Sequence, residues 1–599
     1  MNKILEKLKD FYLHHHFSIA LLFLGAVGIT AILVVFSYNL ASFQIYEDLI
    51  TGDWPKQDDW RYDGGESVMD KVGNAVGLGS GGANFGAPMA TQKMTESANL
   101  GLSVGGAKDV NNFRDNIEND YLPLTTDITY EGLFYDYYFD TGQTEECEDL
   151  FCPSYTTAVS PDPFSGEDDY YLSVGLNSGL KKEDFARKKL NLVVVLDISG
   201  SMSSSFNKYY YDRFGNKQEL EEEVAGKSKM EIATESINSL LDHLKEGDRF
   251  GMVLFDNSAH LAKPLNLVER TNMNAIKDHI SEIVPRGGTR MSAGMEKGTE
   301  LFEDLGKSDP EEYENRIIFL TDAMPNLGNT SEEGLLGMTR GNAQDKIYSS
   351  FVGIGVDFNT ELVEAITKIR GANYYSVHSP EQFKERMDTQ FEYMVTPLVF
   401  DLNLTLEAEG YEIKKVYGSP EADEATGEIM KVNTLFPSET KEGKTKGGLV
   451  LLKLERKSDN PELKLKVSYE DRAGKKYQNE TEVAWQKEEQ FYDNTGIRKG
   501  IVLSRYADLI KNWIRDERVS EAENQPVEPS IEPREGIIIP PPFPPQLGEW
   551  ERQSIPLEVS SDYQELFAEF QEYLETEQES LSEDNLEQEA EILDKLIEL

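Results

Sequence analysis

The sequence predicts an α/β protein built around a doubly wound, mostly parallel sheet. Four largely apolar runs are typical of strands buried on both faces: 192–196, 250–255, 317–320 and 347–354. Stretches with apolar residues at helical spacing, such as 230–244 and 290–305, separate these runs. Such alternation favours a Rossmann-like sheet of about six strands, with helices on both faces.

Changes in composition divide the rest of the chain. Residues 398–487 alternate apolar and polar side chains, which predicts an antiparallel, sandwich-like β domain. A further strand at 170–176 precedes the α/β unit, so that unit is either inserted into one β-rich body or docked on it. In chain order we expect a cytoplasmic N-terminus (1–16), a transmembrane helix (17–38), a flexible Gly-rich tether (39–100), an α+β extension (101–189), the α/β domain (190–397), the β domain (398–487), an amphipathic helix (488–520), a Pro-rich linker (521–561) and an acidic helical tail (562–599).

The N-terminus indicates a membrane anchor. Residues 17–36 carry no charged side chain, and a helix needs about 20 such residues to cross a bilayer. Lys3, Lys7 and Lys9 precede this run, and acidic residues follow it. The positive-inside rule then places residues 1–16 in the cytoplasm and the main domains outside the plasma membrane. Whether the segment is cleaved as a signal peptide stays open.

Composition narrows the class of partner. The formal net charge is −49, from 59 basic and 108 acidic residues, so binding to nucleic acid is not expected. The two cysteines, Cys147 and Cys152, could close a small disulfide loop in an oxidising compartment, with free thiols as the alternative.

Polar oxygen donors follow two of the apolar strands. Asp197, Ser199 and Ser201 come directly after the first, and Asp322 follows the run at 317–320. Parallel strands present their carboxyl ends at one edge of a sheet, so these side chains can lie close together. Thr289, after the glycine turn at 287–288, offers another hydroxyl. Carboxylates and hydroxyls suit Mg²⁺, or Ca²⁺ or Mn²⁺, rather than zinc or copper.

Asp197-x-Ser199-x-Ser201, then Thr289, then Asp322 resembles the complete metal-ion-dependent adhesion site of von Willebrand factor type A (vWA) domains. One departure is Ala323, where that family often has glycine. The resemblance implies that Ser199, Ser201 and Thr289 contact the ion, and that the aspartates act directly or through water. It also implies an open coordination position for a carboxylate of a protein partner. The wider layout resembles bacterial membrane-anchored vWA proteins labelled calcium-activated-chloride-channel-like, and more loosely inter-alpha-trypsin inhibitor heavy chains.

A long insertion follows the first metal loop. Its aromatic residues Phe206, Tyr209, Tyr210 and Tyr211 could form a rim that selects a partner. Alternatively, the insertion folds back and covers the edge of the sheet.

Three classes of function remain. The first is a membrane-anchored adhesion or interaction module that binds a protein through a divalent ion. The second is an envelope scaffold or assembly factor, and protease accessibility in intact cells distinguishes a cytoplasmic domain of this kind from the first. The third is a metal-dependent hydrolase, which the absence of HExxH, GxSxG and P-loop motifs disfavours. We therefore expect a protein that is not an enzyme.

Overall fold

The computed structural model of the chain describes residues 55–63, 99–105, 111–143, 148–204, 209–211, 217–219, 227–303, 305, 312–322, 332–354, 368–377, 380–388, 390–419, 428–458, 462–483, 490–524, 555–581 and 586–599. The predicted membrane span at 17–38, most of the tether and most of the Pro-rich linker lie outside these residues. Among the helices of the described ranges, none is long and apolar enough to span a bilayer.

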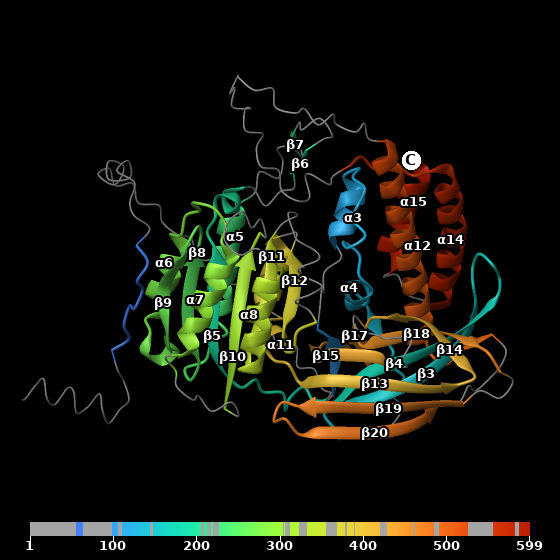
Figure 1. Ribbon diagram of the computed structural model, residues 1–599, viewed down its shortest axis with the longest axis horizontal. Helices are drawn as coiled ribbons and strands as arrows, with labels where there is room; N and C mark the ends of the chain where they lie inside the picture. Colours follow the sequence, from blue (N-terminus) through green and yellow to red (C-terminus); the bar gives the residue numbers. More distant parts are fainter. Residues whose placement is uncertain are drawn as a thin grey trace, which may run out of the picture. The chain divides into compact units, whose positions relative to one another are not determined.

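Six strands form the sheet of the α/β domain, in the order β12-β11-β10-β5-β8-β9 (Figure 1). All neighbouring pairs are parallel except β8 and β9. The strands are β5 (Lys189–Asp197), β8 (Arg249–Phe255), β9 (Ala259–Leu267), β10 (Tyr313–Thr321), β11 (Ile347–Ile354) and β12 (Asn373–Val377). The predicted doubly wound, mostly parallel sheet is confirmed, with an antiparallel strand at one edge.

Helices cover both faces of this sheet. One face packs against α5 (Lys229–Leu241), α6 (Met273–Ser281), α10 (Pro380–Met387) and α11 (Phe391–Val395), and the other against α7 (Met291–Glu303) and α8 (Glu332–Gln344). In β5, Leu192, Val194 and Leu196 belong to the first core, whereas Val193 and Val195 belong to the second. Because successive strand residues face opposite sides, a strand covered on both faces must be apolar throughout, as this one is.

The α/β domain is inserted into a second, antiparallel sheet. This ten-stranded sheet contains β1 (Asn99–Val104), β3 (Cys152–Pro161) and β4 (Asp168–Lys181) from before the α/β domain. After that domain come β13 (Val399–Glu409), β14 (Tyr411–Tyr417), β15 (Glu428–Ser438), β18 (Leu449–Arg456), β19 (Glu462–Asp471), β20 (Lys476–Val483) and β21 (Phe491–Tyr492). β4 pairs with β18 and β1 pairs with β15, both antiparallel, so the two chain segments share one sheet.

This arrangement differs from the sandwich-like domain expected for residues 398–487 alone. The strands of that segment are hydrogen-bonded into one sheet with strands that precede the α/β domain. Alternating apolar residues show that one face of a strand is buried, but not whether a second sheet or a helix buries it. Three short strands form a separate small sheet: β2 (Tyr138–Phe139), β16 (Thr440–Lys441) and β17 (Lys444–Lys446).

A helical layer packs beside this sheet and includes the C-terminus of the chain. It contains α3 (Asn111–Glu118), α4 (Tyr130–Tyr135), α12 (Thr495–Asn524), α14 (Ser561–Leu581) and α15 (Glu587–Glu598). In α12, the consecutive residues Ile501, Val502 and Leu503 are all buried, so this helix is covered on more than the single face expected for 488–520.

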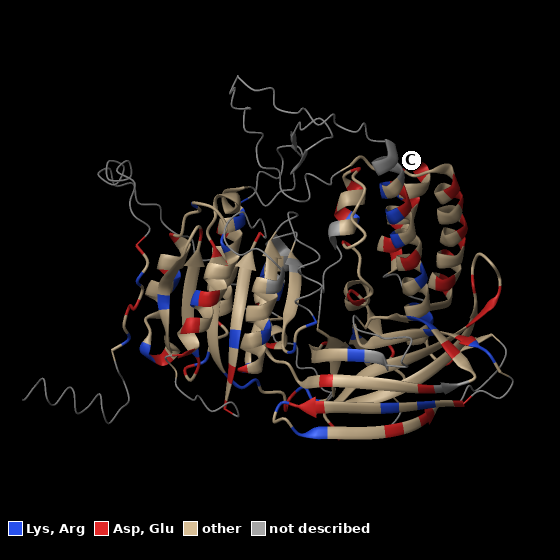
Figure 2. Ribbon diagram, viewed as in Figure 1, with Lys and Arg blue, Asp and Glu red and all other residues tan. Residues whose placement is uncertain are grey.

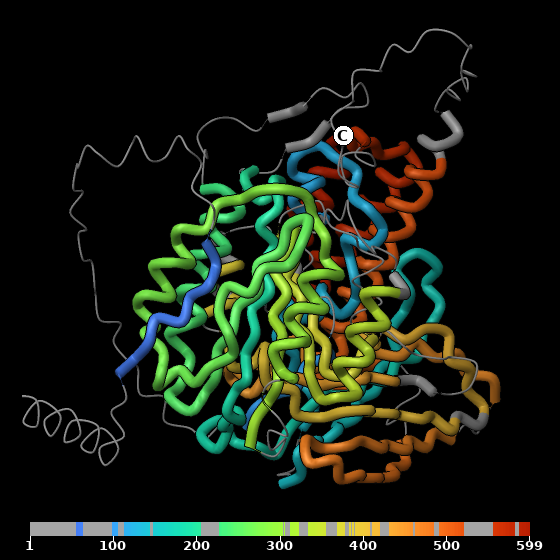
Figure 3. The backbone as a smooth tube through the Cα atoms, turned by 60° about the vertical axis from the view of Figure 1, so that its left-hand side comes forward, coloured from blue at the N-terminus to red at the C-terminus, as the bar shows by residue number. Residues whose placement is uncertain are grey.

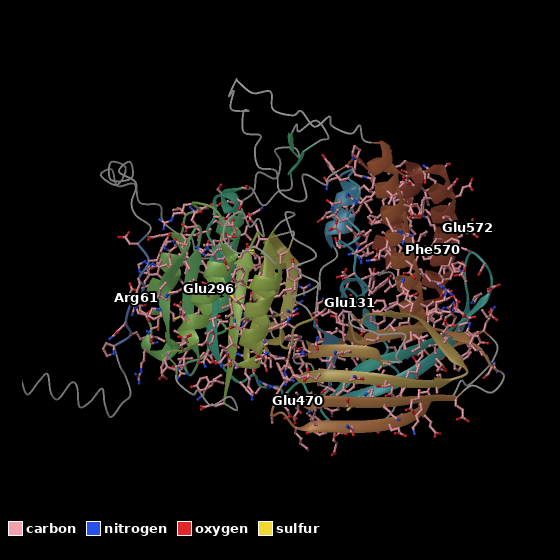
Figure 4. The ribbon with its side chains drawn as sticks, viewed as in Figure 1. Arg61, Glu131, Glu296, Glu470, Phe570 and Glu572 are labelled. Atoms are coloured by element: carbon pink, nitrogen blue, oxygen red, sulfur yellow. The ribbon has the colours of Figure 1, made fainter. Side chains whose placement is uncertain are left out.

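The segment expected to be an acidic tail is part of this core. Phe570 of α14 is fully buried, while Glu572 is exposed, and Figure 4 labels both. Acidic residues recur along α14 in Figure 2. Buried Arg114 of α3 donates to Glu589 of α15 through Nη2, with 2.5 Å to Oε1. The apolar residues of this expected acidic tail therefore pack within the chain.

A short part of the expected tether is ordered against the edge strand β9. The backbone N–H of Arg61 donates to the carbonyl of Ala262 at 2.7 Å, and Asp59 pairs with Lys263 at 3.1 Å. Trp60 stacks on His279 with 5.3 Å between ring centroids. Figure 3 shows this segment in blue beside the α/β domain, and Figure 4 labels Arg61. Residues 59–63 of the expected tether therefore contact the α/β domain through their backbone and through aromatic and charged side chains.

Burial of α15 can be tested with one leucine inside the helix and one directly after it. Leu593 is fully buried, whereas Leu599 is 51% exposed. We expect Leu593→Ala to lower the free energy of unfolding by about 2–5 kcal/mol, because it leaves a cavity in the helical core. Leu599→Ala should change it by less than about 0.5 kcal/mol. Urea unfolding followed by circular dichroism measures both, and equal effects would show that α15 is not part of the cooperative core.

Candidate metal centre

The ends of β5 and β10 bring two aspartates to the same edge of the sheet. The two strands are parallel, and Leu196 lies opposite Leu320, so Asp197 and Thr321 are adjacent and Asp322 is one residue further on. The Thr321 hydroxyl donates to Oδ2 of Asp197 at 2.7 Å. Strand register thus places Asp322 beside the loop that follows Asp197, as predicted from the sequence.

The loop after β5 carries the two serines toward these carboxylates. The backbone N–H of Ser199 donates to Oδ1 of Asp197 at 2.8 Å, which turns the chain into the short 3₁₀ helix η1 (Gly200–Ser203). The hydroxyls of Ser199 and Ser201 are 3.0 Å apart, and that of Ser201 donates to Oδ1 of Asp322 at 2.9 Å. The structure therefore joins four of the five predicted residues in one series of hydrogen bonds.

The loop that carries Thr289 is attached to the same turn. The N–H of Arg286 donates to the carbonyl of Ile198 at 2.5 Å, and the N–H of Gly200 donates to that of Gly287 at 3.0 Å. Gly287 has φ +73°, a conformation that favours glycine. Thr289 is 1% exposed. The glycine turn expected from the sequence thus lets the Thr289 loop pack against the serine loop.

Burial and charge act strongly on Asp197. Its side chain is fully buried, and this desolvation together with the neighbouring charge of Asp322 raises the pKa of Asp197 to about 7. Hydrogen bonds from Thr321 and Ser199 oppose the shift but do not cancel it. Burial beside the charge of Asp322 therefore disfavours the ionised form of the Asp197 carboxyl.

Lys229 is a member of this cluster that the sequence reasoning missed. It is the first residue of α5, its side chain is 5% exposed, and its Nζ lies 3.3 Å from Oδ2 of Asp322. Its backbone N–H donates to the carbonyl of Ser204 at 3.0 Å, which attaches α5 to the serine loop. A charged residue at the start of the helix after the serine loop could have indicated a contact with the site. The long insertion between the loop and the helix makes this proximity hard to recognise in the sequence.

The donor set fits a hard divalent cation. Asp197, Ser199, Ser201, Thr289 and Asp322 offer only oxygen from their side chains, and the hydroxyl of Ser201 lies within hydrogen-bond distance of both Ser199 and Asp322. In the described part of the chain, no group of three or more His, Cys, Asp or Glu side chains is arranged to hold a metal ion. The site depends on hydroxyls in addition to its two carboxylates.

Two other predictions are only partly within the described residues. Tyr209, Tyr210 and Tyr211 form strand β6 (Tyr209–Tyr211), which pairs with β7 (Lys217–Glu219) in a hairpin, while Phe206 lies outside the described residues. Their role as a partner-selecting rim stays a prediction. Cys152 is disulfide-bonded, but Cys147 lies outside the described residues, so the Cys147–Cys152 pairing also stays a prediction.

The raised pKa of Asp197 predicts how the metal-free protein responds to pH. The folded-state pKa of about 7 lies above the ordinary value of 3.8, so between these values the folded protein binds more protons than the unfolded chain. In chelator, the free energy of unfolding should therefore fall as pH rises from 4 to 7, by at most about 1.4 kcal/mol per pH unit from this group. Asp322, whose charge acts on Asp197, and Lys229, which contacts Asp322, remain in both proteins when wild type is compared with Asp197→Asn.

The measurement is the difference in unfolding free energy between wild type and Asp197→Asn across this range. Asp197→Asn keeps an oxygen for Thr321 but cannot titrate, so it should lose the Asp197 part of the slope. Parallel pH profiles for the two proteins would show that the Asp197 carboxyl is not perturbed.

Comparisons with known proteins agree with this arrangement. Residues 192–324 match the family model described as von Willebrand factor type A domain. Inter-alpha-trypsin inhibitor heavy chain H1 of Mesocricetus auratus is 24% identical over 229 residues, covering 37% of this chain and 22% of that protein. Heavy chain H4 of Homo sapiens is 24% identical over 213 residues, covering 35% and 20% respectively. The chain thus spans about a fifth of the length of these curated relatives.

Among solved structures, a von Willebrand factor type A protein from Catenulispora acidiphila aligns with a TM-score of 0.37 and 15% identity, over 62% of this chain and 81% of that one. The family match includes Asp197 at the end of β5 and Asp322, which directly follows β10. Residues 192–324 of the chain are therefore part of a von Willebrand factor type A domain.

Proposed function

We propose that this protein is a membrane-anchored, extracytoplasmic interaction module whose vWA domain binds a protein partner through a divalent metal ion. The observation that carries the proposal is the convergence of two buried carboxylates and two serine hydroxyls at one sheet edge, with the Thr289 loop attached beside them. vWA domains are associated with protein–protein interaction or adhesion, which supports a binding role for this chain.

The ion would be held by Asp197, Ser199, Ser201, Thr289 and Asp322. A bound Mg²⁺, or Ca²⁺ or Mn²⁺, would supply positive charge and a coordination position for a carboxylate from the partner. The net charge of −49 supports this dependence, because a strongly acidic protein repels an acidic ligand unless a cation lies between them. The hydroxyls are the part of the site that adds donors without adding further negative charge.

The membrane part of the proposal comes from the sequence of residues 1–53. The uncharged run at 17–36, with lysines before it and acidic residues after it, supports a single span with a cytoplasmic N-terminus. The metal site and the β-rich body then lie outside the plasma membrane. Residues 59–63, which pack on the α/β domain, would lead the chain from the anchor to that domain.

Metal uptake is expected to depend on Ser199 and not on a nearby serine. Isothermal titration calorimetry with MgCl₂ and MnCl₂ should show binding to wild type that chelator abolishes. Ser199→Ala removes one oxygen donor and should weaken binding by at least about tenfold, or ~1.4 kcal/mol. Ser203→Ala is the matched control, because this exposed serine on the same turn donates to the carbonyl of Gly200 instead.

Both variants should melt at the wild-type temperature in chelator, which would show that the loss concerns the ion and not the fold. Absence of divalent binding to wild type at millimolar concentrations would contradict the proposed metal site.

Partner binding is expected to follow the metal. Detergent-solubilised membranes are passed over immobilised full-length protein in Mg²⁺, and retained proteins are eluted with chelator. Wild type and Ser203→Ala should retain the same proteins, and Ser199→Ala should lose them. Retention of the same set by Ser199→Ala, or by wild type in chelator, would overturn the metal-dependent mechanism.

A further inference from the structure

A buried lysine side chain contacts Asp322 at the candidate metal centre. Lys229 Nζ lies 3.3 Å from Asp322 Oδ2, and the exposed fractions of the two side chains are 5% and 0%. Lysine is almost never fully buried unless its charge is paired. The Asp322 carboxylate is therefore a partner that makes this burial tolerable.

The start of helix α5 does not itself favour a cation at Lys229. Lys229 is the first residue of α5, where the helix dipole favours negative charge. The same turn has the capping box between Ser228 and Glu231, in which the Ser228 N–H donates to Glu231 Oε2 at 2.7 Å. The helix start is thus already stabilised without Lys229, and the lysine adds an unfavourable charge there, which the Asp322 carboxylate offsets.

Both oxygens of Asp322 are engaged in this arrangement. Oδ1 accepts from the Ser201 hydroxyl and Oδ2 accepts from Lys229. A metal ion that uses Asp322 must therefore share this carboxylate with the ammonium or move it aside. Like charges disfavour each other strongly in a buried site, so an ion and the ammonium oppose one another.

We propose that Lys229 is an internal competitor of the divalent ion, which neutralises Asp322 in the metal-free protein and lowers the affinity of the centre for metal. The inference rests on the proposed function, because it concerns regulation of the same site. In each of the two states proposed for the centre, a cation balances the negative charge of Asp322. In one, Lys229 pairs with Asp322, and in the other the metal holds the carboxylate and Lys229 is displaced from it.

The test compares two lysines at the start of the same helix. Lys229→Met removes the buried ammonium. Lys227→Met removes an equal charge two residues earlier, from an exposed lysine whose Nζ lies 2.6 Å from Glu235 Oε1. Titration calorimetry with MgCl₂ should give about tenfold or tighter binding for Lys229→Met and little change for Lys227→Met, since only the first contacts Asp322.

A second readout needs no metal. In chelator, Lys229→Met should lower the melting temperature more than Lys227→Met does, because Asp322 is left buried without its partner. At saturating Mg²⁺ this deficit should shrink, since tighter binding stabilises the variant more. If Lys229→Met does not fold in chelator, Lys229→Gln replaces it, because the amide still donates to Asp322 but carries no charge.

The outcomes separate this inference from the proposed function. Equal or weaker Mg²⁺ binding by Lys229→Met, or by Lys229→Gln if that variant is used, with binding by wild type intact, would overturn the competition and leave the metal site standing. Absence of binding to wild type and variants alike would overturn the metal site itself, and the competition with it.

Discussion

Two aspartates at neighbouring strand ends create the constraint on which this molecule depends. Parallel register between β5 and β10 places Asp197 and Asp322 at one buried edge, and a buried carboxylate is costly unless charge or hydrogen bonds compensate it. Neighbouring groups offset the free-energy cost of burying these carboxylates. Thr321 and the Ser199 N–H donate to Asp197, Ser201 and Lys229 donate to Asp322, and the pKa of Asp197 rises. A metal ion bound at this edge would replace these donors or share the carboxylates with them.

The centre was largely predictable because its residues follow from two simple regularities. Asp197, Ser199, Ser201 and Asp322 come directly after apolar runs, and the carboxyl ends of parallel strands meet at one edge. Lys229 was not predictable in this way, since it belongs to the helix that follows a long insertion and its contact depends on how that helix is attached to the serine loop. Thr321 was missed because its hydroxyl acts through strand register rather than through a motif.

The rest of the fold shows what sequence periodicity can and cannot predict. Alternation in β13 and β19 predicted strands correctly, but strand partners such as β4 with β18 are nearly 280 positions apart and no local pattern identifies them. In the C-terminal segment, acidic composition suggested a tail, while the apolar stripes decided the outcome by packing on α12. Residues 59–63 likewise escaped prediction, since an ordered contact such as Trp60 on His279 depends on a surface that the segment's own sequence does not encode.

The insertion of the vWA domain between β4 and β13 has a mechanical consequence. The domain is joined to the β-rich sheet by two short connections, 182–188 and 396–398, and both lead into strands that have hydrogen-bonded neighbours on each side. Tension applied to a ligand at the metal edge would therefore be divided between two strands in the interior of one sheet. Neither strand lies at an open edge of the sheet, so neither can be removed by breaking hydrogen bonds on one side alone. The connection between the two domains should therefore resist such tension.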